Sequence, residues 1–202
     1  MRILNDAQDI AALHSWIQSL DRATTVLTKS GGTADFSRES VGRFWSWIQP
    51  QCTFGPYYNS TDDPLDIAPD TLPEWAKTKG HQRIRKLANI STLELMSHLA
   101  RYYGECLRKA VPEAQWIILK DSDPRPPQAI LIGGNEPSLV IPLTPQHKYG
   151  ATVSPIHLVS ILVMRTVTQS QESTDILTAY DRDLQELKQG VLYAAKQAHE
   201  RA

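Results

Sequence analysis

A long amphipathic helix followed by short apolar segments is the feature that most constrains this fold. Apolar side chains recur at helical spacing between residues 91 and 111, and Ser91 with Glu94 forms a capping box. Pro112 ends this helix because proline has no amide proton for the next hydrogen bond. Three apolar segments follow, which the sequence predicts to be strands: 116–119, 129–132 and 139–141. We therefore expect an α+β fold, with a small antiparallel sheet of three to four strands covered by long helices.

Helices are expected on both sides of this helix–sheet core. In the N-terminal part, residues 1–50, one helix runs from Asp6 to Lys29 and another starts at Ser37. The Ser154–Pro155 pair opens a further helix after the sheet. The whole chain is thus expected to be one domain, made of the parts 1–50, 53–86 and 91–202.

The last helix begins near Thr174 and keeps a heptad spacing of apolar residues. Packing on the core is the favoured interpretation of that stripe. The alternative is a homodimer through residues 174–200.

Gly104 and Glu105 stand out inside the helix of residues 91–111. Glycine costs about 1 kcal/mol relative to alanine in a helix interior, so Gly104 predicts that another element approaches closely. Glu105 is expected to be a surface residue that pairs with Arg101 or Lys109, four positions away.

Composition limits the classes of function. The net charge is −1, from 21 basic and 22 acidic residues, which argues against extensive binding of nucleic-acid phosphates. Cys52 and Cys106 form no paired motif, so we expect no disulfide framework, and Cys106 is expected to be an inert, buried thiol. The N-terminal residues lack the apolar region of a signal peptide and no apolar run is long enough to span a bilayer, so a cytoplasmic, non-membrane protein is expected.

Motifs that carry chemistry do not occur in this sequence. The six histidines have no metal-ligand spacing, and the GxSxG and SxxK patterns of serine nucleophiles are missing. The Gly31–Gly32 and Gly133–Gly134 pairs fit a helix end and a hairpin turn better than a phosphate-binding loop. We therefore expect no catalytic residue, no cofactor and no metal.

The irregular segment 53–86 is the best candidate for a contact surface. Its acidic first half, from Asp62 to Glu74, is followed by a basic half from Lys77 to Lys86. Aromatic anchors and matched charges are typical of protein interfaces. The residues expected to bind a protein partner are Trp47, Tyr57, Tyr58, Asp62, Asp63, Trp75, Arg83 and Arg85.

Two short motifs carry a resemblance. Asp35 to Val41 reads DFSRESV before a tryptophan-bearing helix, and Tyr102 to Leu107 reads YYGECL before Trp116. These stretches resemble motifs of small bacterial α/β domains of uncharacterised function, including immunity-type partners of toxins. The resemblance covers about half of the chain and leaves out residues 53–81. It implies partner binding and assigns no catalytic residue.

The leading hypothesis is thus a non-catalytic protein-binding module in a bacterium, such as an immunity or antitoxin-like inhibitor or an adaptor. Two alternatives stay open. One is an enzyme whose site is assembled from dispersed residues around His81, Glu105 and His147. The other is nucleic-acid binding through the basic residues 77–86, a weaker hypothesis because only Trp75 lies near them for base stacking.

Overall fold

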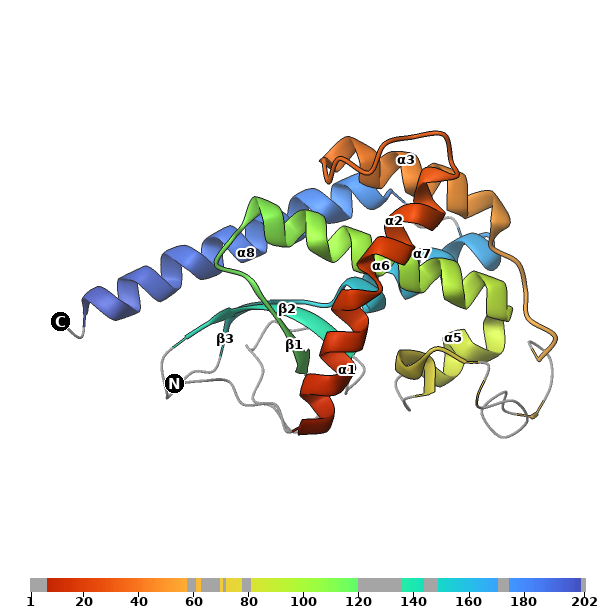
Figure 1. Ribbon diagram of the computed structural model, residues 1–202, viewed down its shortest axis with the longest axis horizontal. Coiled ribbons are helices and arrows are strands. Elements are labelled where there is room, and N and C mark those ends of the chain that lie inside the picture. The colour runs from red at the N-terminus through yellow and green to blue at the C-terminus, as the bar shows by residue number, and fades with distance from the viewer. Residues whose placement is uncertain are drawn as a thin grey trace.

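Helices surround a three-stranded antiparallel sheet, which confirms the expected α+β class. The computed structural model describes residues 7–57, 61–62, 70, 72–77, 81–119, 136–143, 149–170 and 175–200. Figure 1 shows the long helix α6 (Ile90–Ala110) crossing over the sheet, with other helices arranged around it.

The N-terminal part is helical, but the first helix is interrupted at Ser19. Helix α1 (Ala7–Gln18) ends just before this residue and α2 (Leu20–Thr28) begins just after it. The Ser19 hydroxyl donates to the carbonyl oxygen of Ser15 at 2.6 Å, a local bond that often bends helices. Gly31, with φ of +85°, follows the end of α2, as the glycine pair predicted. The expected cap Asp6 lies outside the described residues.

Helix α3 (Arg38–Ile48) begins at the predicted cap. The hydroxyl oxygen of Ser37 accepts a hydrogen bond from the amide of Ser40 at 3.1 Å. A short 3₁₀ turn, η1 (Gln49–Gln51), follows and contains Pro50.

The sheet has the strand order β1-β2-β3, with both pairs antiparallel. Its strands are β1 (Gln115–Leu119), β2 (Glu136–Pro142) and β3 (Tyr149–Val153). Strand β3 was not predicted, because its glycine, alanine and threonine weaken the apolar alternation that identifies a strand. The predicted strand at 129–132 lies outside the described residues.

Helix α6 covers one face of the sheet and differs from prediction in its cap. Its start is two residues earlier than the capping box implies: the Asn89 side chain accepts from the amide of Thr92 at 2.7 Å, so Ser91 lies within the helix. The close approach predicted at Gly104 is confirmed. An added Cβ there would come within 2.5 Å of Cζ2 of Trp116, which projects from β1.

Helices α7 (Pro155–Val167) and α8 (Ile176–His199) complete the core. Ser154 caps α7 as predicted, accepting from the amide of His157 at 3.3 Å. Gly190 of α8 lies so close to β3 that an added Cβ would be 2.6 Å from Cβ of Ala151. This part of the heptad stripe therefore packs on the core, as favoured.

The end of α8 extends past the sheet (Figure 1), and Leu192 there is 71% exposed. The homodimer through residues 174–200 stays a prediction.

The segment that follows α3 contains more regular structure than expected. It includes a 3₁₀ helix, η3 (Glu74–Lys77), and a short α-helix, α5 (Gln82–Leu87). Phe54 and Ala88 form an isolated bridge, which ties the start of the segment to its end. Across the described ranges, no helix is long and apolar enough to cross a membrane.

Candidate functional site: a cleft between the first helices and α6

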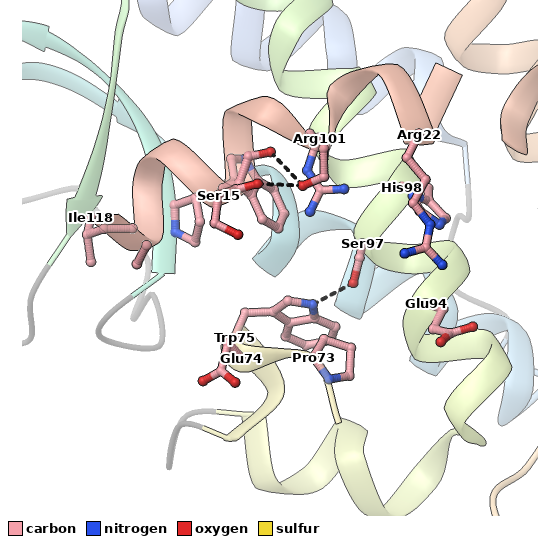
Figure 2. A pocket seen from close by; sticks show the side chains of 14 residues that line it. Ser15, Arg22, Pro73, Glu74, Trp75, Glu94, Ser97, His98, Arg101 and Ile118 are labelled. Atoms are coloured by element: carbon pink, nitrogen blue, oxygen red, sulfur yellow. Dashed lines mark hydrogen bonds between the residues drawn. The ribbon is translucent and has the colours of Figure 1, made fainter. Parts of the chain in front are cut away.

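A cleft of about 530 Å³ lies between α1, α2, η3, α6 and the sheet. This volume is within the usual range of ligand-binding pockets. Figure 2 shows Arg22, His98 and Arg101 on one side of the cleft and Pro73 with Trp75 opposite them. The principal lining residues are Ser15, Trp16, Ser19, Arg22, Pro73, Glu74, Trp75, Glu94, Ser97, His98, Arg101, Ile118 and Pro137.

Two tryptophans give the cleft its aromatic character. The ring of Trp16 in α1 meets that of Trp116 edge-on, with 6.2 Å between their centroids. On the opposite wall, the indole N–H of Trp75 donates to the Ser97 hydroxyl at 2.7 Å, and that hydroxyl donates to the carbonyl oxygen of Leu93 at 2.9 Å. Both indoles are therefore held in place by packing or hydrogen bonds, and they offer preformed apolar walls.

Arg101 places a positive charge beside the aromatic rings of the cleft. Its guanidinium carbon lies 4.2 Å from the centroid of the Trp16 ring, a cation–π contact. Burial is the main cause that lowers the pKa of Arg101 to about 10, and the nearby charge of Arg22 adds to the effect. With a pKa of about 10, Arg101 stays charged near pH 7, so the cleft contains a partly buried positive charge.

His98, one turn before Arg101, is affected by the same charges. Burial, followed by the charges of Arg101 and Arg22, lowers the pKa of His98 to about 4. The imidazole is therefore neutral near pH 7, and the two arginines carry the positive charge of the cleft.

This pKa predicts that acid destabilises the protein through His98. An unfolded histidine takes up its proton near pH 6.5, whereas folded His98 does so only near pH 4. The unfolded chain therefore binds more protons as the pH falls through this window, so the free energy of unfolding decreases. Because His98 is partly exposed, we expect this contribution to be about 1–2 kcal/mol.

Urea unfolding of the wild type and of His98→Gln, at about pH 7 and about pH 4.5, measures this contribution. The variant should lose about 1–2 kcal/mol less than the wild type between the two pH values. Equal losses would show that His98 is not the group responsible.

A buried polar network lies behind Trp75. The ring of His81 contacts Trp75 edge-on at 5.0 Å between centroids, and its Nε2 lies 3.0 Å from Oε2 of Glu136. The Ser154 hydroxyl donates to Oε1 of the same carboxylate. Glu136 is 0% exposed, so these protein groups take the place of water around its carboxyl group. The network fixes the segment around Trp75 against the start of β2 and the start of α7.

The residues expected to bind a partner are divided between surface and core. Asp62 and Arg83 are exposed, and Trp47 and Tyr57 are half-buried, with Trp47 packed against the core. Tyr58 and Asp63 lie outside the described residues.

Trp75 and Arg85 require correction. Trp75 is 4% exposed and belongs to the core, so it is no exposed anchor, although its ring contributes to the cleft wall. Arg85 is 3% exposed and donates to the carbonyl oxygen of Ala76. Because His81 is buried too, the basic half of the segment is not a continuous charged surface.

The dispersed residues of the enzyme hypothesis have separate environments. His81 faces Glu136, as described, whereas Glu105 forms an ion pair with Arg108 at 2.5 Å and lies near the indole N–H of Trp116. Glu105 is buried and pairs three positions along the helix, which corrects its predicted surface position and its predicted partners. His147 lies outside the described residues. Within the described ranges, no three His, Cys, Asp or Glu side chains gather as metal ligands.

Sequence reasoning missed the cleft because its residues come from separate elements. His98 and Arg101 lie three positions apart on α6, and the sequence indicated Arg101 only as a partner of Glu105. Trp16 carried a weak signal, as a large apolar residue within the predicted first helix. By contrast, the prediction for Cys106 is confirmed: it is buried, and burial raises the pKa of its thiol well above the ordinary value.

Comparisons with protein-family models, with curated proteins and with solved structures found no match to this chain.

Proposed function

We propose that this protein is a non-catalytic binding module, and that its contact site for a protein partner is the cleft between α1, α2 and α6. The observation that carries the proposal is the combination of rigid tryptophan walls with arginine side chains in one preformed cavity. Tryptophan and arginine are the side chains most enriched at the energetic centres of protein interfaces. The cleft volume matches one or two side chains of a partner rather than a large surface.

The described acid–base groups favour binding over catalysis. The carboxylate that faces His81 is buried together with it behind Trp75, away from the cleft. In the cleft itself, His98 is neutral near pH 7 and its pKa is lowered by two arginines, while the hydroxyl of the neighbouring Ser97 is bonded to Trp75 and to the carbonyl oxygen of Leu93. The resemblance of the DFSRESV and YYGECL stretches to immunity-type bacterial domains supports the same function class.

The cleft replaces residues 53–86 as the proposed centre of contact. Trp75 forms part of the cleft wall although it belongs to the core. Exposed residues of that segment, such as Asp62 and Arg83, are proposed to contact the periphery of the partner. Rim charges of this kind mainly influence the association rate.

A variant that fills the cleft tests the proposal. Ser15 is exposed on α1 and lines the cleft, so Ser15→Trp should block it while leaving the fold intact. Ser46→Trp, at an exposed position of α3, is the matched control. Immobilised wild-type chain, each variant and a blank support are exposed to an extract of the source cells, and retained proteins are quantified by mass spectrometry.

We expect a defined protein to be retained by the wild type and by Ser46→Trp, and to fall at least about ten-fold with Ser15→Trp. Purified, that protein should bind with one-to-one stoichiometry. Retention that is equal for all three chains, or no retention above the blank support, would overturn the proposal.

A further inference from the structure

Arg22 and Arg101 lack a carboxylate partner among the described residues, unlike three other arginines of the chain. Arg38 pairs with Asp181 at 2.6 Å, Arg108 with Glu105, and Arg182 with Asp183. Within the described part of the chain, neither cleft arginine forms an ion pair.

Three nitrogen atoms at the cleft are buried without a hydrogen bond among the described residues. They are Nε1 of Trp16, Nε of Arg101 and Nδ1 of His98. The first two are obligate donors, and Trp16 is only 7% exposed. Buried donors of this kind are costly unless an acceptor reaches them. The chemical group that would complete this wall is therefore an oxygen acceptor, and the arginine charges favour an anionic one.

The other walls of the cleft carry apolar side chains. Trp75 and Pro73 face the arginines across the cleft, and Ile118 with Pro137 closes it on the side of the sheet. A small hydrated anion alone would leave these surfaces uncovered. The arrangement suits an anionic group that is attached to an apolar one.

We propose that the cleft binds an oxyanion, a carboxylate or a phosphate, that a peptide segment of the partner presents beside an apolar side chain. This inference rests on the proposed function and specifies the chemistry of the partner. The anion pairs with Arg22 and Arg101, and the apolar side chain lies between Trp16 and Trp75. Arginine suits this role because its planar group donates two parallel hydrogen bonds to carboxylate or phosphate oxygens.

Two glutamates near the cleft modulate this selectivity. Glu74 is neutralised by Lys77, whose Nζ lies 2.6 Å from its Oε1. Glu94 is exposed at the rim, one turn before His98, and forms no ion pair among the described residues. Its negative charge opposes an incoming anion, so removal of that charge should strengthen binding. Glu94 thereby gives a variant with an effect opposite in sign to that of the arginine variants.

The test uses three peptides that differ only in the central residue: acetyl-Leu-Glu-Leu-amide and its phosphoserine and glutamine counterparts. Each is titrated into the full chain, and the indole N–H signals are followed by NMR, with the Trp16 signal assigned from Trp16→Phe. We expect at least one anionic peptide to shift the Trp16 signal and to bind at least about ten-fold more tightly than the glutamine peptide. Bound anion should also raise the pKa of His98 by about one unit, because it offsets the arginine charges.

Variants that remove single charges show whether the peptide binds through its anionic group or only through its apolar side chains. Arg22→Gln, at an exposed position, and Arg101→Gln should each weaken binding of the anionic peptide by about ten-fold, whereas Glu94→Gln should strengthen it about two-fold. Lys188→Gln removes an exposed positive charge of α8, a helix that does not line the cleft, and should change nothing. Tighter binding of the phosphoserine peptide would identify a phosphorylated segment as the source, and tighter binding of the glutamate peptide an acidic one.

The inference is overturned if neither anionic peptide binds more tightly than the glutamine peptide, or if Arg22→Gln binds the anionic peptides as the wild type does. In either case, if Ser15→Trp no longer retains the partner protein, the cleft is still the proposed contact site, but its ligand is not an anion. Retention that is unaffected by Ser15→Trp would instead show that the proposed function itself is wrong.

Discussion

Gly104→Ala should lower the free energy of unfolding by about 2 kcal/mol, although alanine at a helix interior normally adds about 1 kcal/mol relative to glycine. The reason is the contact between α6 and the sheet. An added Cβ would come within 2.5 Å of Cζ2 of Trp116 and 2.9 Å of Cγ of Pro155. Trp116 has little freedom to move, because its ring packs on Trp16 and its indole N–H lies 3.3 Å from Oε2 of Glu105.

Gly42→Ala is the matched control for this variant. Gly42 is also helical, but its added Cβ would lie 3.0 Å from the end of the Leu177 side chain, which can rotate away. We expect its stability to stay within about 1 kcal/mol of the wild type. Urea unfolding of both variants measures the difference, and a Gly104→Ala protein as stable as the wild type would refute the close approach.

Glu136→Ala should cost about 3 kcal/mol, because it removes a buried carboxylate and leaves its buried polar neighbours without a partner. The carboxylate is fully buried, contacts His81 and accepts from the Ser154 hydroxyl. Without it, two buried polar groups lose their partner and a cavity forms. Glu136→Gln keeps the shape and an acceptor for Ser154, so it should cost less.

Two further variants test whether the loss of stability comes from the contact between Glu136 and His81. Glu113→Ala changes an exposed glutamate just after α6 and should alter stability by less than about 0.5 kcal/mol. A double-mutant cycle with His81→Ala should show a coupling of at least about 1 kcal/mol between His81 and Glu136. Coupling near zero, or an equal effect of Glu113→Ala and Glu136→Ala, would contradict the buried pair.

The Glu136 network also bears on the cleft. His81 contacts the ring of Trp75, and that ring forms one wall of the cleft. Mutations at Glu136 should therefore change peptide binding as well as stability, whereas Gly42→Ala should change neither. This difference separates variants that deform the cleft wall from variants that leave it unchanged.

Local patterns in the sequence determined much of the fold. The helical period before Pro112 and the Ser37 and Ser154 caps depend on residues near one another in the chain. Such features follow from backbone sterics and short-range hydrogen bonds, so a sequence reveals them directly. The antiparallel sheet followed in the same way from its short apolar segments, apart from β3, whose small residues weaken the signal.

Only the tertiary structure decided which polar and aromatic residues lie inside. Trp75 and Arg85 belong to a segment with the composition of an exposed loop, yet packing against α6 and neighbouring backbone buries both. The cleft unites Trp16, Arg22 and Arg101, which come from three helices and carry no shared spacing. Their proximity arises from long-range packing, which local propensity does not encode, and for this reason the sequence predicted the scaffold but not the site.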